Sequence, residues 1–366
     1  MYTKSIGLTI NDILRNHIQP NASFRKQSVL IQSAAALTMI MFVTGLINGI
    51  FSLITFQNKE LRQIGCGMYL FASSITTILT ITMFTVKFWF VVVTQLYATI
   101  NLSILRTDCV FIGPVSKLCL YLDGWFNACI AIERTVNVAK GVHFNKQMSK
   151  RIARLIITIL PIIVMCTIVH EPIHHDLFQY TTQKYKLINN NLTMNRTQEN
   201  HADQSKRSVK ESFEYEIEHH VLCIIRYSRT LQTYNTITLF CHLIIPFLAN
   251  LCSALFIIFG TARRRSTAQS NQTFKEHILK QLSEHRQLLI SPIILLLLDM
   301  PRLLLSLISG CVDPSSYHWL YFFGYFISYI PPMLVFSVFV LPSELYRKTF
   351  KDSIKSWRQQ NYRRHR

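Results

Sequence analysis

Seven long apolar runs follow one another along the chain, separated by shorter polar segments. They cover about residues 28–56, 64–90, 107–132, 152–170, 235–260, 287–310 and 317–341. Each approaches the ~20 residues that a helix needs to cross a bilayer, and none alternates as a barrel strand would. Buried helices of a soluble protein would keep a polar stripe. The pattern therefore predicts an all-α membrane protein, a seven-transmembrane helix bundle over residues 28–341.

The distribution of charge gives this bundle an orientation. Only 16% of the 366 residues are charged, although the net charge is +19. The segments expected inside are 57–63, 133–151, 261–286 and 342–366, and they hold more than half of the basic residues but six of the 19 acidic ones. Because Lys and Arg concentrate in cytoplasmic loops, we expect a multi-pass plasma-membrane protein with its N-terminus outside and its C-terminus in the cytoplasm. The basic excess then contacts membrane lipids, and no nucleic acid is expected as a partner.

Sequons for N-glycosylation agree with this orientation. Four of them fall on segments expected outside, at Asn21, Asn101, Asn191 and Asn195. A fifth, at Asn271, falls on an inner segment and is expected to be unmodified. The motif is short and frequent, so it supports the orientation only together with the charge bias.

Polar segments complete the organisation of the chain. Residues 1–27 form an extracellular N-terminus that lacks the compact apolar core of a cleaved signal peptide. A long second outer loop covers 171–234, and an inner loop covers 261–286. Residues 342–366 are predicted to form an amphipathic helix on the inner surface and a cytoplasmic tail. The apolar stripe of that helix consists of Leu345, Tyr346, Phe350, Ile354 and Trp357.

An acid and a base stand side by side at the end of the third run. Glu133 and Arg134 follow four apolar residues, and Cys109 lies 25 residues before Arg134. That separation is about 37 Å along a helix, a full bilayer crossing, so the pair marks the inner end of span three. The residues alone leave two interpretations open: the ordinary polar end of a helix, or a switch in which the carboxylate holds the guanidinium.

Several motif positions recur at characteristic places along the spans. They are Asn48 in "GLIN", Cys109, Glu133-Arg134-Thr135, Cys223, Pro246 and Pro301. Together these positions resemble the rhodopsin-like (class A) G-protein-coupled receptors, over about residues 28–357. The sequences "ISPIILLLLDMPRLLLS" and "FVLPSELYRKTF" are similar to a divergent invertebrate branch, of the kind found in rotifers.

The resemblance implies a receptor that senses an extracellular ligand and activates a heterotrimeric G protein. Glu133, Arg134 and Thr135 would form the switch for the G protein, and Cys109 and Cys223 would form a disulfide that pins the second outer loop. Span seven lacks the family's Asn-Pro-x-x-Tyr motif. A seven-helix receptor that no longer couples is therefore a further interpretation.

Two clusters of polar residues fall inside the spans. Ser74 stands at the family's span-two aspartate position, and Asp123 stands on span three. With Asn48 they are expected to form an oxygen-lined site for Na⁺, the alternative being a hydrogen-bonded structural Asp123. No other cofactor and no metal site is expected, although five histidines border the second outer loop.

Three further ionisable residues are candidates for ligand binding. Lys117 lies two turns below Cys109, and it either meets an anionic ligand group or forms an intramolecular pair. Asp299 and Arg302 lie three apart on span six, so they either line a functional site or pair with each other.

Acidic residues in the second outer loop suggest the class of ligand. The stretch "ESFEYEIEHH" before Cys223 is rich in Glu, which is either a solvated charged loop or a site for a cationic partner such as a basic peptide, the first guess at the ligand class.

One rival function class is a transporter or channel. It would use Lys117, Asp123, Asp299 and Arg302 as a conduction path, but the repeat halves typical of transporters are absent from the sequence. No catalytic motif is present, so an enzyme is not expected.

Overall fold

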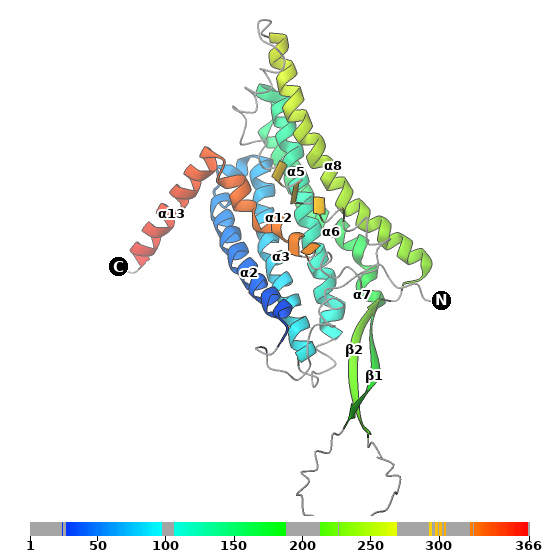
Figure 1. The fold of residues 1–366 in the computed structure, drawn as a ribbon. Coiled ribbons are helices and arrows are strands. Elements are labelled where there is room, and N and C mark those ends of the chain that lie inside the picture. The colour runs from blue at the N-terminus through cyan, green and yellow to red at the C-terminus, as the bar shows by residue number, and fades with distance from the viewer. Residues whose placement is uncertain are drawn as a thin grey trace, which may run out of the picture.

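The computed structural model shows five long helices arranged as a bundle (Figure 1). The structure describes residues 24, 27–96, 106–187, 213–225, 227–268, 293–294, 297–298, 300–301, 304, 323–324 and 326–364. Over 175–187 and 213–225 it describes the backbone alone.

Each of the first five apolar runs forms a helix long and apolar enough to cross a membrane. The helices are α2 (Val29–Phe56), α3 (Gly65–Leu96), α5 (Gly113–Lys140), α6 (Lys146–Ile168) and α8 (Arg229–Ala268). Predicted span six lies largely outside the described residues, whereas most of span seven, from residue 326 on, is described and forms short helical segments and turns. Five helices could thus cross a membrane, which suggests a multi-pass membrane protein, and the seven-span count stays a prediction.

The helices extend beyond the predicted membrane boundaries. A π-turn, η3 (Asp108–Ile112), leads into α5, which continues past Arg134 to Lys140. After the short turn η4 (Gly141–His143), the side chain of Asn145 accepts the backbone N–H of Met148 at 3.1 Å and caps α6. The segment expected as an inner loop is therefore mostly helical. A similar turn, η2 (Leu61–Gln63), joins α2 to α3.

The second outer loop contains a β-hairpin, which the sequence did not predict, beside the helices that were expected. After the short helix α7 (His170–His174), β1 (His175–Leu187) pairs antiparallel with β2 (Phe213–Ile225). The hairpin projects from one end of the bundle, and α13 begins at the opposite end (Figure 1). We call these the hairpin end and the α13 end.

Two glycines allow α2 and α3 to approach closely. A Cβ on Gly45 would lie 2.9 Å from Cγ1 of Ile81, and one on Gly49 would lie 2.6 Å from Cγ1 of Ile78. Small residues four apart are typical of tightly packed helices in membranes. Larger side chains at these positions would force the helices apart.

The core has two apolar clusters with a buried hydroxyl layer between them. One cluster includes Phe84, Phe88 and Tyr329, and the other includes Tyr69, Phe126 and Phe339. Between their positions on α3, the buried side chains are hydroxyls. These are Ser73, Ser74, Thr76, Thr77 and Thr80.

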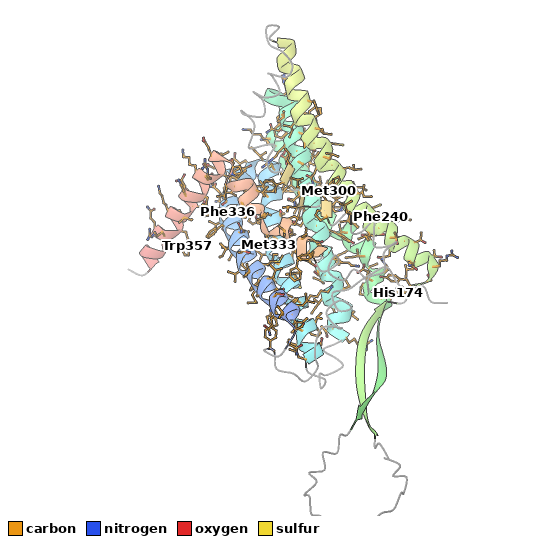
Figure 2. All side chains as sticks on the ribbon, viewed as in Figure 1. His174, Phe240, Met300, Met333, Phe336 and Trp357 are labelled. Atoms are coloured by element: carbon orange, nitrogen blue, oxygen red, sulfur yellow. The ribbon has the colours of Figure 1, made fainter. Side chains whose placement is uncertain are left out.

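The chain ends in α12 (Ile330–Met333), the π-turn η5 (Phe336–Val340) and α13 (Glu344–Arg364). Phe350 of α13 packs against Phe336 and Phe51, with ring centroids 5.0 and 5.4 Å away. Figure 2 labels Phe336 in the bundle and Trp357 on the part of α13 that extends away from it. Leu345 and Trp357 are instead 63% and 64% exposed. The predicted apolar stripe is thus divided between a docked face and an exposed one.

Candidate functional site

Glu133 at the α13 end of α5 contacts two other helices. The Ser149 hydroxyl on α6 donates a short hydrogen bond to Oε1 of Glu133, and it accepts the backbone N–H of Gly65 at 3.1 Å. The backbone N–H groups of Gly65 and Cys66, the first of α3, face the carboxylate. A negative charge is stabilised at a helix N-terminus because the first N–H groups are unpaired there. Glu133 therefore joins α3, α5 and α6.

Gly65 is required for this arrangement. A Cβ at this position would lie 2.7 and 2.8 Å from the two carboxylate oxygens of Glu133 and 2.7 Å from the Ser149 hydroxyl. Any other residue would displace the carboxylate from the end of α3.

Arg134 reaches a different set of partners. Its guanidinium carbon lies 5.0 Å from the ring centroid of Phe339 in η5, and the group hydrogen-bonds to the Cys66 thiol and the Tyr346 hydroxyl. These three partners are neutral. The contacts described for Glu133 and for Arg134 lie on different elements, although the guanidinium also acts electrostatically on the carboxylate.

Tyr346 links the arginine to α13 and α2. Its ring packs edge-on against Phe56, with centroids 5.3 Å apart. Burial, more than the nearby Cys66 thiol, raises the pKa of the Tyr346 phenol, so the hydroxyl is neutral at physiological pH. The third residue of the motif, Thr135, donates to the Ala131 carbonyl at 3.0 Å, as an ordinary helical threonine does.

The residues predicted for an ion site each have hydrogen-bond partners on other helices, and the ion itself stays a prediction. Asp123 is 2% exposed and accepts hydrogen bonds from Ser73 at 3.3 Å and Thr77 at 3.5 Å. Ser74 bonds instead to Ser52 at 2.7 Å. The amide of Asn48 accepts from Ser337 at 3.1 Å. The described contacts correspond to the alternative of a hydrogen-bonded structural Asp123.

At the hairpin end, Lys117 forms an ion pair. Its Nζ lies 2.6 Å from Oε1 of Glu171 in α7, and the two side chains are 42% and 3% exposed. This is the intramolecular pair that the sequence left as one of two interpretations. Glu171 was not singled out, because it lies 54 residues away at the start of a predicted loop.

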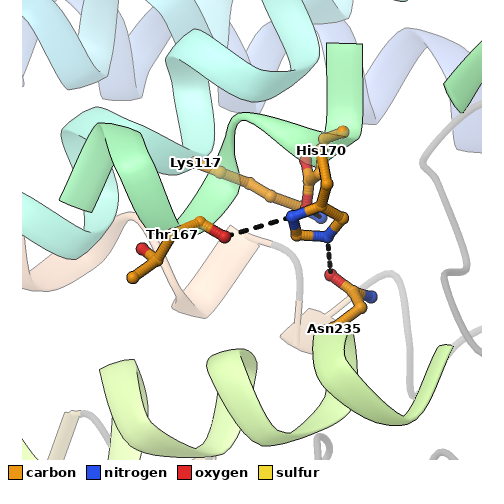
Figure 3. Close-up of polar contacts among 5 residues, drawn as sticks. Lys117, Thr167, His170 and Asn235 are labelled. Atoms are coloured by element: carbon orange, nitrogen blue, oxygen red, sulfur yellow. Dashed lines mark hydrogen bonds and ion pairs between the residues drawn. The ribbon is translucent and has the colours of Figure 1, made fainter. Parts of the chain in front are cut away.

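Histidine and tyrosine side chains surround this ion pair. His170 bonds through Nδ1 to the Thr167 carbonyl at 3.1 Å and through Nε2 to the Asn235 amide oxygen at 3.3 Å (Figure 3). Tyr227 packs against His170, with ring centroids 5.6 Å apart. Burial first and Glu171 second raise the pKa of the Tyr227 phenol. The Lys117–Glu171 ion pair thus lies among histidine and tyrosine side chains.

A second histidine joins three helices. The indole N–H of Trp125 donates to Nδ1 of His242 at 2.9 Å. Because an indole only donates, Nδ1 carries no proton and His242 is the Nε2–H tautomer. Nε2 then donates to the Thr167 hydroxyl at 2.8 Å, and Tyr121 stacks on the imidazole at 4.6 Å. This network links α5, α6 and α8, and the sequence did not predict it.

Other predicted sites lie wholly or partly outside the described residues. Cys109 is in η3 and Cys223 is opposite Leu177 in the hairpin, and β1 lies against η3. The side chains of both cysteines are outside the description, so their disulfide stays a prediction, and none forms among the six described cysteine side chains. The ligand residues Asp299 and Arg302 and the glycosylation positions are also outside it. Those positions are Asn21, Asn101, Asn191 and Asn195.

No protein-family model matches the sequence, and no curated protein matches it either. Among the described side chains, no group of three or more potential ligands is placed to hold a metal ion. The grounds for assigning a function are therefore the geometry of the site and the resemblance of its motifs.

Proposed function

We propose that the chain is a G-protein-coupled receptor of the rhodopsin-like type. It senses an extracellular ligand, with a cationic peptide as the first choice, and activates a heterotrimeric G protein through Arg134. Five membrane-length helices support this proposal, together with two further apolar runs over 287–310 and 317–341. The basic inner segments support an extracellular hairpin end and a cytoplasmic α13 end.

The observation that carries the proposal is the division of charge at the α13 end. Glu133 has its own partners in Ser149 and the N-terminus of α3. Oε1 of Glu133 therefore keeps its hydrogen bond to Ser149 when Arg134 moves. A cation–π contact contributes about 0.5–2 kcal/mol, and a hydrogen bond to a charged group about 1.5–3 kcal/mol. Contacts of this strength would keep the guanidinium in place in the resting receptor. They are weak enough for the G protein to compete for it on activation.

The ion pair at the hairpin end supports a ligand site, with Asp299 and Arg302 as further proposed contacts. An anionic ligand group at Lys117 would displace Glu171. That exchange would act on α7, and hence on the α6 and hairpin segments joined to it. Ligand binding would thus act on the helix that carries Ser149 at its other end.

Substitution of Arg134 tests the proposal. Cells expressing the parent or Arg134→Ala, at matched surface density, would receive a library of basic peptides while second messengers and membrane current are recorded together. The matched control is Arg347→Ala, which removes a 51% exposed arginine from α13. A second-messenger response in the parent and the control, lost in Arg134→Ala, is expected. A peptide-evoked current that persists in Arg134→Ala would favour the transporter or channel instead.

A further inference from the structure

The hairpin has two open edges. In the part of the chain that the structure describes, β1 and β2 pair only with each other. The outer edge of each strand therefore presents unpaired backbone N–H and C=O groups at alternate residues. A two-stranded hairpin is marginally stable in water, and a third strand stabilises it. Strand addition is an established way for sheets to bind extended peptides.

The two edges differ in charge. On β2, Glu214, Glu216 and Glu218 occupy alternate register positions. On β1, Lys184 and Lys186 lie opposite Glu216 and Glu214. A strand added beside β2 would therefore have acidic neighbours, and one added beside β1 would have basic neighbours. Since opposite charges favour cross-strand pairing and like charges oppose it, a cationic strand is directed to β2.

The remaining β2 positions indicate the rest of the pattern. Phe213, Tyr215 and Ile217 alternate with the glutamates, so they belong to the other face of the sheet. A strand pairing in register would carry apolar residues beside them. The edge thus favours one repeating pattern, with basic and apolar residues in alternation.

We propose that the free edge of β2 binds the ligand as an added strand, an extended peptide in which Lys or Arg alternates with apolar residues. This inference rests on the proposed function in placing the hairpin outside the cell. It adds the ligand's conformation and sequence pattern. Backbone hydrogen bonds would provide the affinity, and the glutamates would select the charge.

Direct binding tests this proposal without a signalling readout. The probe is a fluorescent heptapeptide that alternates Lys and Val, and the full chain is held in zwitterionic lipid nanodiscs at physiological ionic strength. Replacing Glu214, Glu216 and Glu218 by Gln should weaken binding about tenfold, which is about 1.4 kcal/mol for three cross-strand pairs. The matched control, Lys184→Gln with Lys186→Gln, should leave binding unchanged or tighten it.

N-methylation of the probe separates strand pairing from simple charge attraction. One probe is methylated at the lysine amides and another at the valine amides. Because alternate amides of an added strand face β2, one probe should lose binding and the other should retain it. Equal binding of both methylated probes, an unchanged affinity in the Glu→Gln variant, or no binding of the parent probe would overturn the proposal.

The outcome is independent of the switch. Arg347→Ala, which removes an exposed arginine outside the switch, should bind the probe as the parent does. If Arg134→Ala loses signalling but the two methylated probes bind equally, strand addition is refuted and the receptor function is retained. If the probe binds as a strand but no signal depends on Arg134, the receptor function is refuted and strand addition is retained.

Discussion

Replacing Tyr346 by Phe should raise signalling in the absence of ligand. The substitution removes the hydroxyl that bonds to Arg134 but retains the ring that packs against Phe56 at 5.3 Å. It therefore weakens the resting contact of the arginine without undocking α13. The hydroxyl is neutral at physiological pH, so the variant changes a hydrogen bond and no formal charge.

The size of the effect follows from the remaining contacts. A hydrogen bond to a charged group contributes about 1.5–3 kcal/mol. In Tyr346→Phe, Arg134 still contacts the Phe339 ring at 5.0 Å and the Cys66 thiol. We therefore take the lower end of that range, about 1.5 kcal/mol, as the loss of resting-state stability. About 1.5 kcal/mol shifts a two-state equilibrium by about tenfold. Where the active state is a minor population, basal activity should rise by nearly that factor.

The assay is ligand-independent second-messenger production at matched surface expression. Tyr234→Phe is the chemical control, because it also removes a phenol hydroxyl, which bonds to the Thr167 carbonyl at 3.1 Å at the hairpin end. The control should behave as the parent. Basal signalling that is unchanged or lower in Tyr346→Phe would refute the view that this hydroxyl restrains Arg134.

Three stability predictions follow from described contacts, each read as thermal unfolding in detergent. Gly65→Ala should lower the unfolding free energy by about 1–3 kcal/mol, because the added Cβ overpacks against Glu133 and Ser149. The control Gly113→Ala, at the start of α5 with nothing within 4 Å, should not lower it. Equal effects of the two substitutions would contradict the close approach of Glu133 and Ser149 to Gly65. Lys117→Met should lower it by about 3 kcal/mol, and adding Glu171→Gln should recover most of the loss; no recovery would argue against the pair. Trp125→Phe should lower it by about 1–2 kcal/mol by removing the donor to the α8 histidine.

Long apolar runs were the part of the fold that sequence could predict. Hydropathy over about 20 residues specifies a membrane helix almost alone, so α2, α3, α5, α6 and α8 follow from it. The sequence did not predict the hairpin, although Thr and Tyr recur in β1 and Ile recurs in β2, because the polar stretch between the strands dominates the segment. Strand pairing depends on residues far apart in sequence, which a local pattern does not show.

The site was predictable in its charged residues but not in their partners. Glu133 and Arg134 stand out as charges at the end of an apolar run. Ser149 and Tyr346 do not, because a serine in a basic loop and a tyrosine in an amphipathic helix are ordinary there. Their roles arise only when α6 and α13 pack against α5. The same holds for Glu171, which acquires its role from Lys117 across the bundle.

The central claim, that Arg134 couples this chain to a G protein, is tested most directly by nucleotide exchange. The purified chain carrying Tyr346→Phe, which needs no ligand for activity, would be placed in lipid nanodiscs with a panel of heterotrimeric G proteins. The account predicts faster GDP release from at least one heterotrimer, and its loss when Arg134→Ala is added. Exchange that stays at the spontaneous rate for every heterotrimer, or acceleration that survives Arg134→Ala, would contradict it.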